Sequence, residues 1–172
     1  PARDLVQSLD AAEAAAQIEA ELSGAERPVI LLGGGVSREA AREWLPALRR
    51  RGIPIMTSWN AMDRTGVDDP MYFGRPNTWG QRSANILIAQ ADVVVALGSR
   101  LGLQQTGFNW QEFAPSGRVV QVEIDPLEIT KGHPHVDVPL HADANEVLGA
   151  LSSGPAADVP DWLAYCRRAR ER

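Results

Sequence analysis

Short apolar runs alternate with amphipathic stretches along this chain, and the three clearest runs each lead into glycine or aspartate. These runs are Val29–Leu32, Val93–Leu97 and Val119–Ile124. Unbroken apolar runs are typical of parallel strands that helices cover on both faces. Strands that alternate with helices favour a parallel sheet with right-handed crossovers. The pattern therefore predicts an α/β fold.

Weaker patterns supply the remaining elements. Two more strands are predicted at Ile53–Thr57 and Val136–Leu140. The predicted helices run from Asp10 to Leu22, Arg38 to Arg51, Gly80 to Gln90, Asp143 to Leu151 and Asp161 to Arg172.

Several residues mark where these helices begin or bend. Asp10 and Glu13 have the spacing of a capping box, and Ser37 is placed to cap the second helix. Asn77 or Thr78 is placed to cap the third. Pro46 lies inside the second helix, so we expect a kink there or the start of a second short helix.

Composition divides the chain into three parts. Residues 1–26 are predicted to form an N-terminal linker and helix, residues 27–151 the main α/β unit, and residues 152–172 a linker and a charged C-terminal helix. Within the main unit, residues 58–78 and 98–116 have the composition of long loops, and long loops inside compact domains are usually functional.

Composition also excludes several classes of function. The formal net charge of −5 argues against a nucleic-acid surface, which needs clustered Lys and Arg. The one basic cluster, Arg49–Arg51, is interpreted as a solvated helix terminus. No apolar stretch approaches the about 20 residues of a membrane span. The polar start shows no signal peptide, and the single Cys166 fits a reducing compartment, so a cytoplasmic location is expected.

Two glycine-containing turns are the strongest candidates for ligand contact. Gly33, Gly34 and Gly35 follow the first strand, where glycines permit positive φ and let peptide N–H groups approach a phosphate. The alternative is a tight strand-to-helix turn. Gly98-Ser99-Arg100 repeats this placement, and its arginine is suited to phosphate, carboxylate or ring stacking, or else to a surface ion pair. Ligands of parallel sheets lie beyond the carboxyl ends of the strands, so both turns are expected to border one nucleotide-sized crevice.

Polar residues after the later strands leave two interpretations open. Glu123 and Asp125 could accept hydrogen bonds from ribose hydroxyls, or Asp125 could cap a helical turn. Asp143 likewise could contact a ligand or cap the helix that follows it. His133, His135 and His141, with nearby aspartates, match no common zinc spacing, so no metal site is predicted.

No residue pattern indicates a catalytic group. The serines lack the context of a nucleophile elbow, and Cys166 lies on the charged terminal helix. No pair of carboxylates has a spacing that indicates acid–base catalysis. The chain is therefore predicted to carry a binding crevice without catalytic residues.

Six segments in order resemble the central domain of thiamine diphosphate (ThDP) enzymes, and most closely the acetolactate synthase group. They are Arg27–Gly35, Gly52–Thr57, Ala91–Arg100, Thr106-Gly107 with Phe113-Ala114-Pro115, Val122–Pro126 and Ala142-Asp143-Ala144.

The resemblance implies a three-layer, Rossmann-like domain with a six-stranded parallel sheet, the DHS-like NAD/FAD-binding fold that also serves sirtuins. It places this domain between a pyrimidine-binding and a diphosphate-binding domain, which bind ThDP and Mg²⁺ and are absent here. It also implies a homo-oligomeric enzyme. The chain alone is then expected to be an inactive part of a longer transferase or lyase. A sirtuin-like deacylase would need zinc-binding cysteine pairs, and this chain has one cysteine.

In relatives that contain a flavin, FAD crosses this domain. Transfer of the family's motifs gives the following cofactor-binding candidates: Gly33, Gly34, Gly35, Thr78, Trp79, Gly80, Gly98, Ser99, Arg100, Glu123, Ile124, Asp143 and Ala144. The chain departs from the flavin pattern at Gly102 and Gln104, where that pattern has Asp and Arg. The two replacements remove polar anchors for FAD, so the resemblance leaves FAD and an adenine nucleotide as alternative ligands of the crevice.

The expected function is that of the central domain of a ThDP-dependent 2-oxo acid carboligase or decarboxylase, in which ThDP attacks the oxo acid and CO₂ leaves. The alternative is a non-catalytic domain with an empty crevice that packs the two ThDP-binding domains together. Ligand binding would separate the two hypotheses, because only the first predicts stabilisation by FAD or ADP.

Overall fold

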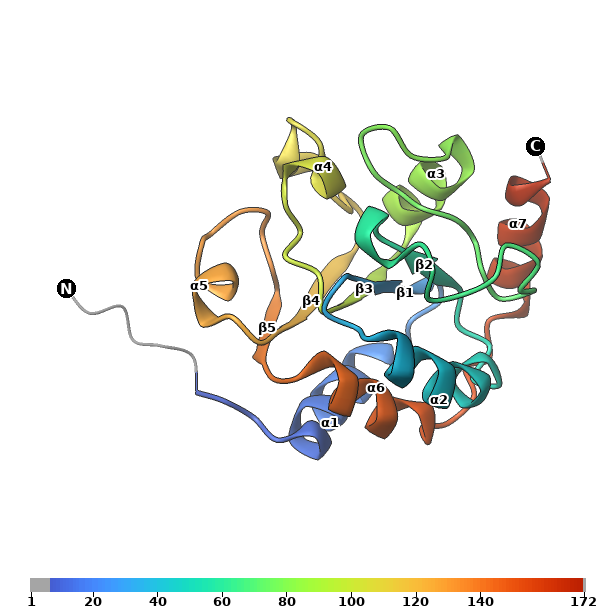
Figure 1. Cartoon of the computed structure of the whole chain (residues 1–172). Coiled ribbons are helices and arrows are strands. Elements are labelled where there is room, and N and C mark those ends of the chain that lie inside the picture. The colour runs from blue at the N-terminus through green and yellow to red at the C-terminus, as the bar shows by residue number, and fades with distance from the viewer. Residues whose placement is uncertain (1–6, 172) are drawn as a thin grey trace.

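A computed structural model describes residues 7–171 and contains a five-stranded parallel sheet. The strands are β1 (Pro28–Leu32), β2 (Ile55–Thr57), β3 (Val93–Leu97), β4 (Arg118–Glu123) and β5 (Val138–His141). Their order across the sheet is β2-β1-β3-β4-β5 (Figure 1). The predicted α/β class and parallel sheet are confirmed.

Every residue of β1, β2 and β3 is buried, as expected for central strands with helices on both faces. Helices α1 (Ala11–Leu22), α2 (Arg38–Arg49) and α6 (Ala144–Ser152) pack together on one face. Helices α3 (Arg82–Gln90) and α7 (Pro160–Arg170) pack together on the other (Figure 1). Short helical turns α4 (Leu103–Thr106) and α5 (Pro126–Ile129), with η1 (Trp59–Ala61) and η2 (Trp110–Glu112), lie in the loops.

The expected sixth strand is not present as a strand in the described part of the chain. Instead, residues 71–74 run beside β2, where Ile55 donates to Met71 O and Phe73 donates to Ile55 O, both at 2.8 Å. Only one residue pair, Ile55 with Tyr72, forms a bridge. Pro70 before this segment and Gly74 after it, with φ +98°, limit the pairing to a single bridge.

The local helix signals correctly predicted the first two N-caps. In α1, Asp10 and Glu13 form a complete capping box. In α2, Ser37 Oγ accepts from the Ala40 N–H at 3.0 Å. The second helix continues through Pro46 as one helix and ends at Arg49.

The predicted start of the third helix was wrong. Helix α3 begins at Arg82, and its N-cap is Gln81, so neither Asn77 nor Thr78 caps it. Asn77 Oδ1 instead accepts from the Trp79 N–H at 2.8 Å, within a turn that precedes the helix.

The C-terminal helix packs closely against the sheet. In α7, Trp162 and Cys166 are buried, and Trp162 Nε1 donates to Pro28 O at 3.0 Å. This bond joins the end of the chain to the first residue of β1. No helix among residues 7–171 combines the length and the apolar character that crossing a bilayer requires.

Stability should fall above pH 9 because of Cys166. Burial raises the pKa of its thiol from 9.0 to about 12. The unfolded thiol therefore loses its proton first, and the contribution of this group is complete below pH 9 and lost as the pH rises toward 12. Denaturant unfolding between pH 8 and 11 should show a slope of up to about 1.4 kcal/mol per pH unit from this group. The Cys166→Ala variant should lack that slope, and an unchanged slope would contradict the assignment.

Candidate functional site

The three predicted turns converge at the carboxyl edge of the sheet. The Gly33 N–H donates to Leu97 O at 2.8 Å, and the Gly35 N–H donates to Gly98 O at 2.9 Å. The Gly98 N–H in turn donates to Val122 O at 2.9 Å. The turns after β1 and β3 and the last residues of β4 are therefore hydrogen-bonded neighbours, and Ile124 after β4 lines the same cleft, which confirms the predicted convergence.

Glycine is required in these turns because the backbones approach closely. A Cβ at Gly33 would lie 2.1 Å from Gly98 O, and one at Gly35 would lie 2.9 Å from Gly98 Cα. Gly98 itself has φ +61°. None of Gly33, Gly34 and Gly35 uses the positive φ that glycine permits. Sequence alone could not tell whether glycine is needed for positive φ or for close backbone approach, because both require the absence of Cβ.

The N–H groups of this turn are largely engaged within the protein. Gly33 and Gly35 donate to the β3 turn, so of the three glycines only Gly34 has an N–H without a described acceptor among residues 7–171. Asn145 supports the same turn from α6, since its Oδ1 accepts from the Ser37 N–H at 2.7 Å and its Nδ2 donates to Gly35 O at 3.2 Å. No pattern in the sequence indicated this role of Asn145.

A cleft of about 720 Å³ opens beside the converging turns. Its lining includes seven of the predicted site residues: Gly34, Gly35, Gly98, Ser99, Arg100, Glu123 and Ile124. Gly33 lies directly behind them. Residues that the sequence did not single out complete the wall: Ser58, Trp59, Asn60, Asn77, Leu101, Gly102, Leu103, Gln104 and Gln105. This volume lies within the range of small-molecule sites.

Arg100 is the one cationic side chain among the described residues that line the cleft. Its side chain is 67% exposed, and its guanidinium lies 4.0 Å from the Asp125 carboxylate. An exposed pair at this distance restrains the side chain weakly. Arg100 is therefore able to reach an anionic group in the cleft.

The carboxylates at the end of β4 stabilise the backbone turn. Glu123 is buried, and its Oε1 accepts from the N–H groups of Ile124 and Asp125 at 3.0 and 3.2 Å. Asp125 caps α5 by accepting from Leu127 N at 3.0 Å. Of the two interpretations left open for Asp125, the cap is the one that the geometry shows.

The loop after β2, which carries Trp59 and Asn60 into the cleft, is anchored by ion pairs. Arg38 Nε lies 2.5 Å from Asp63 Oδ2, and Arg64 also pairs with this carboxylate. The hydrogen bond from Arg38 lowers the pKa of Asp63 from its ordinary value. Arg64 Nε also donates to Val36 O at 2.5 Å, which ties the loop to the glycine turn.

Besides Gly33, five predicted site residues lie outside the cleft wall. Thr78 Oγ1 donates to Gln104 O at 3.1 Å, Trp79 is 68% exposed, and a Cβ at Gly80 would lie 2.2 Å from Arg75 O. Asp143 caps α6 through the Asn145 N–H at 2.7 Å, and Ala144 is buried in the core. Their assignment as cofactor contacts stays a prediction, like that of the seven residues in the wall.

Two buried amides beside the cleft have an atom without a partner among residues 7–171. Gln121 donates to Ser99 O at 2.8 Å, but its Oε1 has no donor. Asn77 is 6% exposed, and its Nδ2 has no acceptor. A buried polar atom without a partner costs about 1–3 kcal/mol. Neither residue carried a sequence signal for this position.

The histidines considered as metal ligands lie apart. His141 Nε2 lies 3.1 Å from Ile124 O, the His133 ring is tilted by 50° against the Trp110 ring, and His135 lies 3.6 Å from Asp137. Residues 7–171 contain no group of three or more His, Cys, Asp or Glu side chains placed to hold a metal ion.

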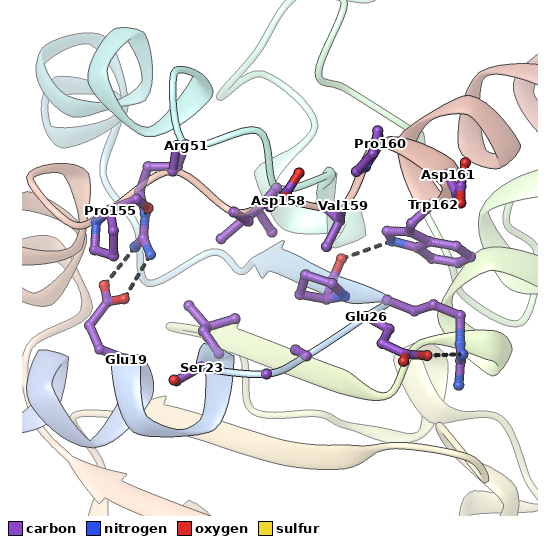
Figure 2. Close-up of a pocket in the computed structure, with 18 of the residues that line it drawn as sticks. Glu19, Ser23, Glu26, Arg51, Pro155, Asp158, Val159, Pro160, Asp161 and Trp162 are labelled. Carbon is purple, nitrogen blue, oxygen red and sulfur yellow. Dashed lines mark hydrogen bonds and ion pairs between the residues drawn. The ribbon is translucent and has the colours of Figure 1, made fainter.

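A larger cavity, of about 1130 Å³, lies at the opposite, amino end of β1. Figure 2 shows Arg51 and Glu19 pointing toward one another on one side of it and Trp162 bonded to Pro28 O on the other. Arg51 is 3% exposed, so the interpretation of Arg49–Arg51 as a solvated terminus was wrong. Arg49 is also paired, with its Nε 2.5 Å from Asp69 Oδ2. Only Arg50 of the three is exposed.

Comparisons with known proteins agree with this architecture. A family model described as "Thiamine pyrophosphate enzyme, central domain" matches residues 14–151. The acetolactate synthase large subunit of Corynebacterium glutamicum is 34% identical over 155 residues, which are 86% of this chain and 24% of that protein. The acetolactate synthase of Mycobacterium avium is 34% identical over 84% of this chain and 24% of its own length. A probable acetolactate synthase large subunit of Methanocaldococcus jannaschii is 35% identical over 83% of this chain and 24% of its own. The chain thus spans about a quarter of the length of these relatives.

Proposed function

Because this chain belongs to the family of thiamine pyrophosphate enzyme central domains, we propose that it serves a ThDP-dependent 2-oxo acid carboligase or decarboxylase and binds FAD or an adenine nucleotide in the cleft at the carboxyl edge of its sheet. The observation that carries the binding proposal is the convergence of the β1, β3 and β4 turns around one cleft of about 720 Å³.

The residues of the cleft fit a nucleotide better than a compact polyanion. Arg100 supplies one positive charge, and the rest of the described wall is largely neutral amide, hydroxyl and apolar surface. The Nδ2 of Asn77 has no acceptor among the described residues, and a bound nucleotide would supply one. With Gly102 and Gln104 in place of the charged residues of the flavin pattern, one charged contact and several neutral hydrogen bonds would hold the ligand.

The chain's own part in the reaction is to position the neighbouring domains, since its described residues include no arrangement of catalytic groups. In the intact enzyme, flanking pyrimidine-binding and diphosphate-binding domains would hold ThDP with Mg²⁺, which would supply the nucleophilic chemistry for decarboxylation of the oxo acid. The chain alone is expected to release no CO₂ from pyruvate when ThDP and Mg²⁺ are added.

Exposed apolar side chains beside the cleft support contact with the flanking domains. Trp59, Leu103 and Ile124 are exposed and line the cleft. Trp79 is also exposed, and its neighbour Thr78 donates to Gln104 O in the cleft wall. Apolar side chains gathered on one side of a protein usually mark a contact surface. This observation favours the second candidate function, in which the domain packs its neighbours around an empty cleft, as much as it favours the first.

Ligand-induced stabilisation separates the two functions. FAD or ADP at 100 times its dissociation constant should add about 2.7 kcal/mol to the free energy of unfolding. For a chain of this size, that gain corresponds to a rise in Tm of about 5–10 °C. Thermal unfolding with FAD, with ADP and without ligand measures the effect. No rise with either ligand would favour the packing role and contradict nucleotide binding.

A further inference from the structure

Two residues lie between the cleft and a smaller, more open pocket beside it. This rear pocket, of about 230 Å³, shares only Asn77 and Gln105 with the lining of the cleft. Its remaining described wall is apolar on one side and polar on the other: Ile88, Ala89, Phe113 and Ala114, then Asn85, Thr106 and Glu112, with Pro76, Thr78 and Gly107 at the edge. Its volume suits one planar ring rather than a whole nucleotide.

The Asn77 amide is held in a single orientation. Its Oδ1 accepts from the Trp79 N–H at 2.8 Å, so its Nδ2 occupies the other position. Asn85 holds the backbone of the same residue, since its Oδ1 accepts from Asn77 N at 2.9 Å and its Nδ2 donates to Asn77 O at 3.0 Å. With the amide fixed in this way, Nδ2 stays buried and finds no acceptor among residues 7–171.

The second partition residue, Gln105, belongs to a segment that can move at little cost in buried area. Gln105 Nε2 donates to Pro76 O. Its helical turn α4 contributes no buried side chain and lies between Leu101, with φ +48°, and Gly107, with φ +82°. A non-glycine residue held at positive φ is strained and commonly occurs next to a binding site. Low burial is typical of segments that open locally.

We propose that the rear pocket is a subsite of the cleft, that Gln105 is its gate, and that Asn77 Nδ2 donates a hydrogen bond to an acceptor on a planar heteroaromatic ring of the bound nucleotide. The inference rests on the proposed nucleotide binding and specifies the position of the ring. The apolar side chains of Ile88 and Ala114 would contact the ring. Displacement of Gln105 would both join the two cavities and uncover the Asn77 donor.

The test compares FAD and ADP binding to the wild type and to Asn77→Asp by titration calorimetry. This change keeps the shape of the side chain and replaces the donor with an acceptor, so we expect about a tenfold loss of affinity. Loss for both ligands would place the adenine ring in the subsite, and loss for FAD alone would place the isoalloxazine ring there. Asn109→Asp is the matched control, because Asn109 is exposed and lines neither the cleft nor the rear pocket, and it should change affinity less than threefold.

Equal affinities of the Asn77→Asp variant and the wild type would overturn the subsite while leaving nucleotide binding intact. A wild type that binds neither ligand would overturn both proposals. The gate is tested by Gln105→Ala, which leaves Asn77 untouched and should raise the association rate several-fold in stopped-flow measurements. If Asn77→Asp does not fold, as judged by circular dichroism, this second variant still decides, since an unchanged association rate would refute the gated subsite.

Discussion

The Arg51→Ala variant should lose about 3 kcal/mol of its free energy of unfolding, the lower end of the usual effect of removing one partner from a buried ion pair, because Arg51 is buried but Glu19 is 28% exposed. The Arg51 guanidinium is 3% exposed and lies 2.7 Å from Glu19 Oε1. The change would leave the Glu19 carboxylate beside an empty space without its counter-charge. For comparison, a typical domain is stable by about 5–15 kcal/mol, so the loss is a large fraction of the total.

Arg51 also joins four separate parts of the chain. Its Nε donates to Pro155 O and its Nη1 to Leu151 O, both at 2.9 Å, and its backbone O accepts from Ala157 N at 2.7 Å. These bonds connect the end of α2 to the end of α6 and to the segment that leads into α7. We therefore expect the variant to loosen α7 as well, which faster hydrogen exchange at residues 155–170 would report.

The neighbouring Arg50→Ala variant is the control. Arg50 is exposed and donates only to Pro46 O at 3.1 Å, so its loss should change the free energy of unfolding by no more than about 0.5 kcal/mol. Denaturant titrations of both variants measure the difference. Equal stability of the two variants would show that the buried pair is not important for the fold.

The Gly33→Ala variant should lose about 3 kcal/mol, the upper end of the usual cost of overpacking, and should also lose any nucleotide binding in the cleft. The new methyl carbon would lie 2.1 Å from Gly98 O and 2.6 Å from Ser99 Cα, and both atoms belong to backbone. A backbone turn cannot yield as a flexible side chain can, so the β1 and β3 turns must separate. Because the Gly33 N–H donates to Leu97 O across that contact, the strand ends should separate too.

Gly102→Ala is the matched control for this prediction. Gly102 lines the same cleft, but a Cβ there meets no atom within 4 Å, and its φ is −73°. Its replacement should change the free energy of unfolding by about 0.5 kcal/mol or less. Thermal unfolding and FAD titration of both variants supply the readouts. Comparable effects at both positions would contradict the close-approach explanation for Gly33.

The chain's local signals predicted those parts of the structure that depend on neighbours in sequence. The cap at Ser37 and the capping box at Asp10 need only residues three positions away, and both are present. The apolar runs correctly identified all five strands because burial on both faces leaves no polar position in the central ones. Because the strands are parallel, the turns that follow them lie at the carboxyl edge of the sheet, and Gly34, Gly98 and Arg100 line one cleft there.

Transfer of motifs from the family also named residues that lie outside the cleft wall. Thr78, Trp79 and Gly80 were candidates, yet their neighbour Asn77 is the residue that reaches the cleft wall. The turn at residues 77–80 is set by Asn85 and Gln104, which approach it from α3 and α4. No pattern within the loop specifies those contacts, so the sequence could not show which of the four side chains turns inward.

The sequence by itself determined the α/β class, the parallel strands, the family and the edge of the sheet where a ligand would lie, since these follow from periodicity and from the order of motifs along the chain. Only the tertiary structure decided that Arg51 is buried, that Gly33 and Gly35 serve close backbone approach, and that Asn77 holds an unpaired donor beside the cleft. The reason is that Arg51 meets Glu19 and Leu151 across 32 and 100 positions of sequence. Gly33 likewise meets a turn on another strand. Contacts over such separations depend on how whole elements pack, and no local pattern encodes them.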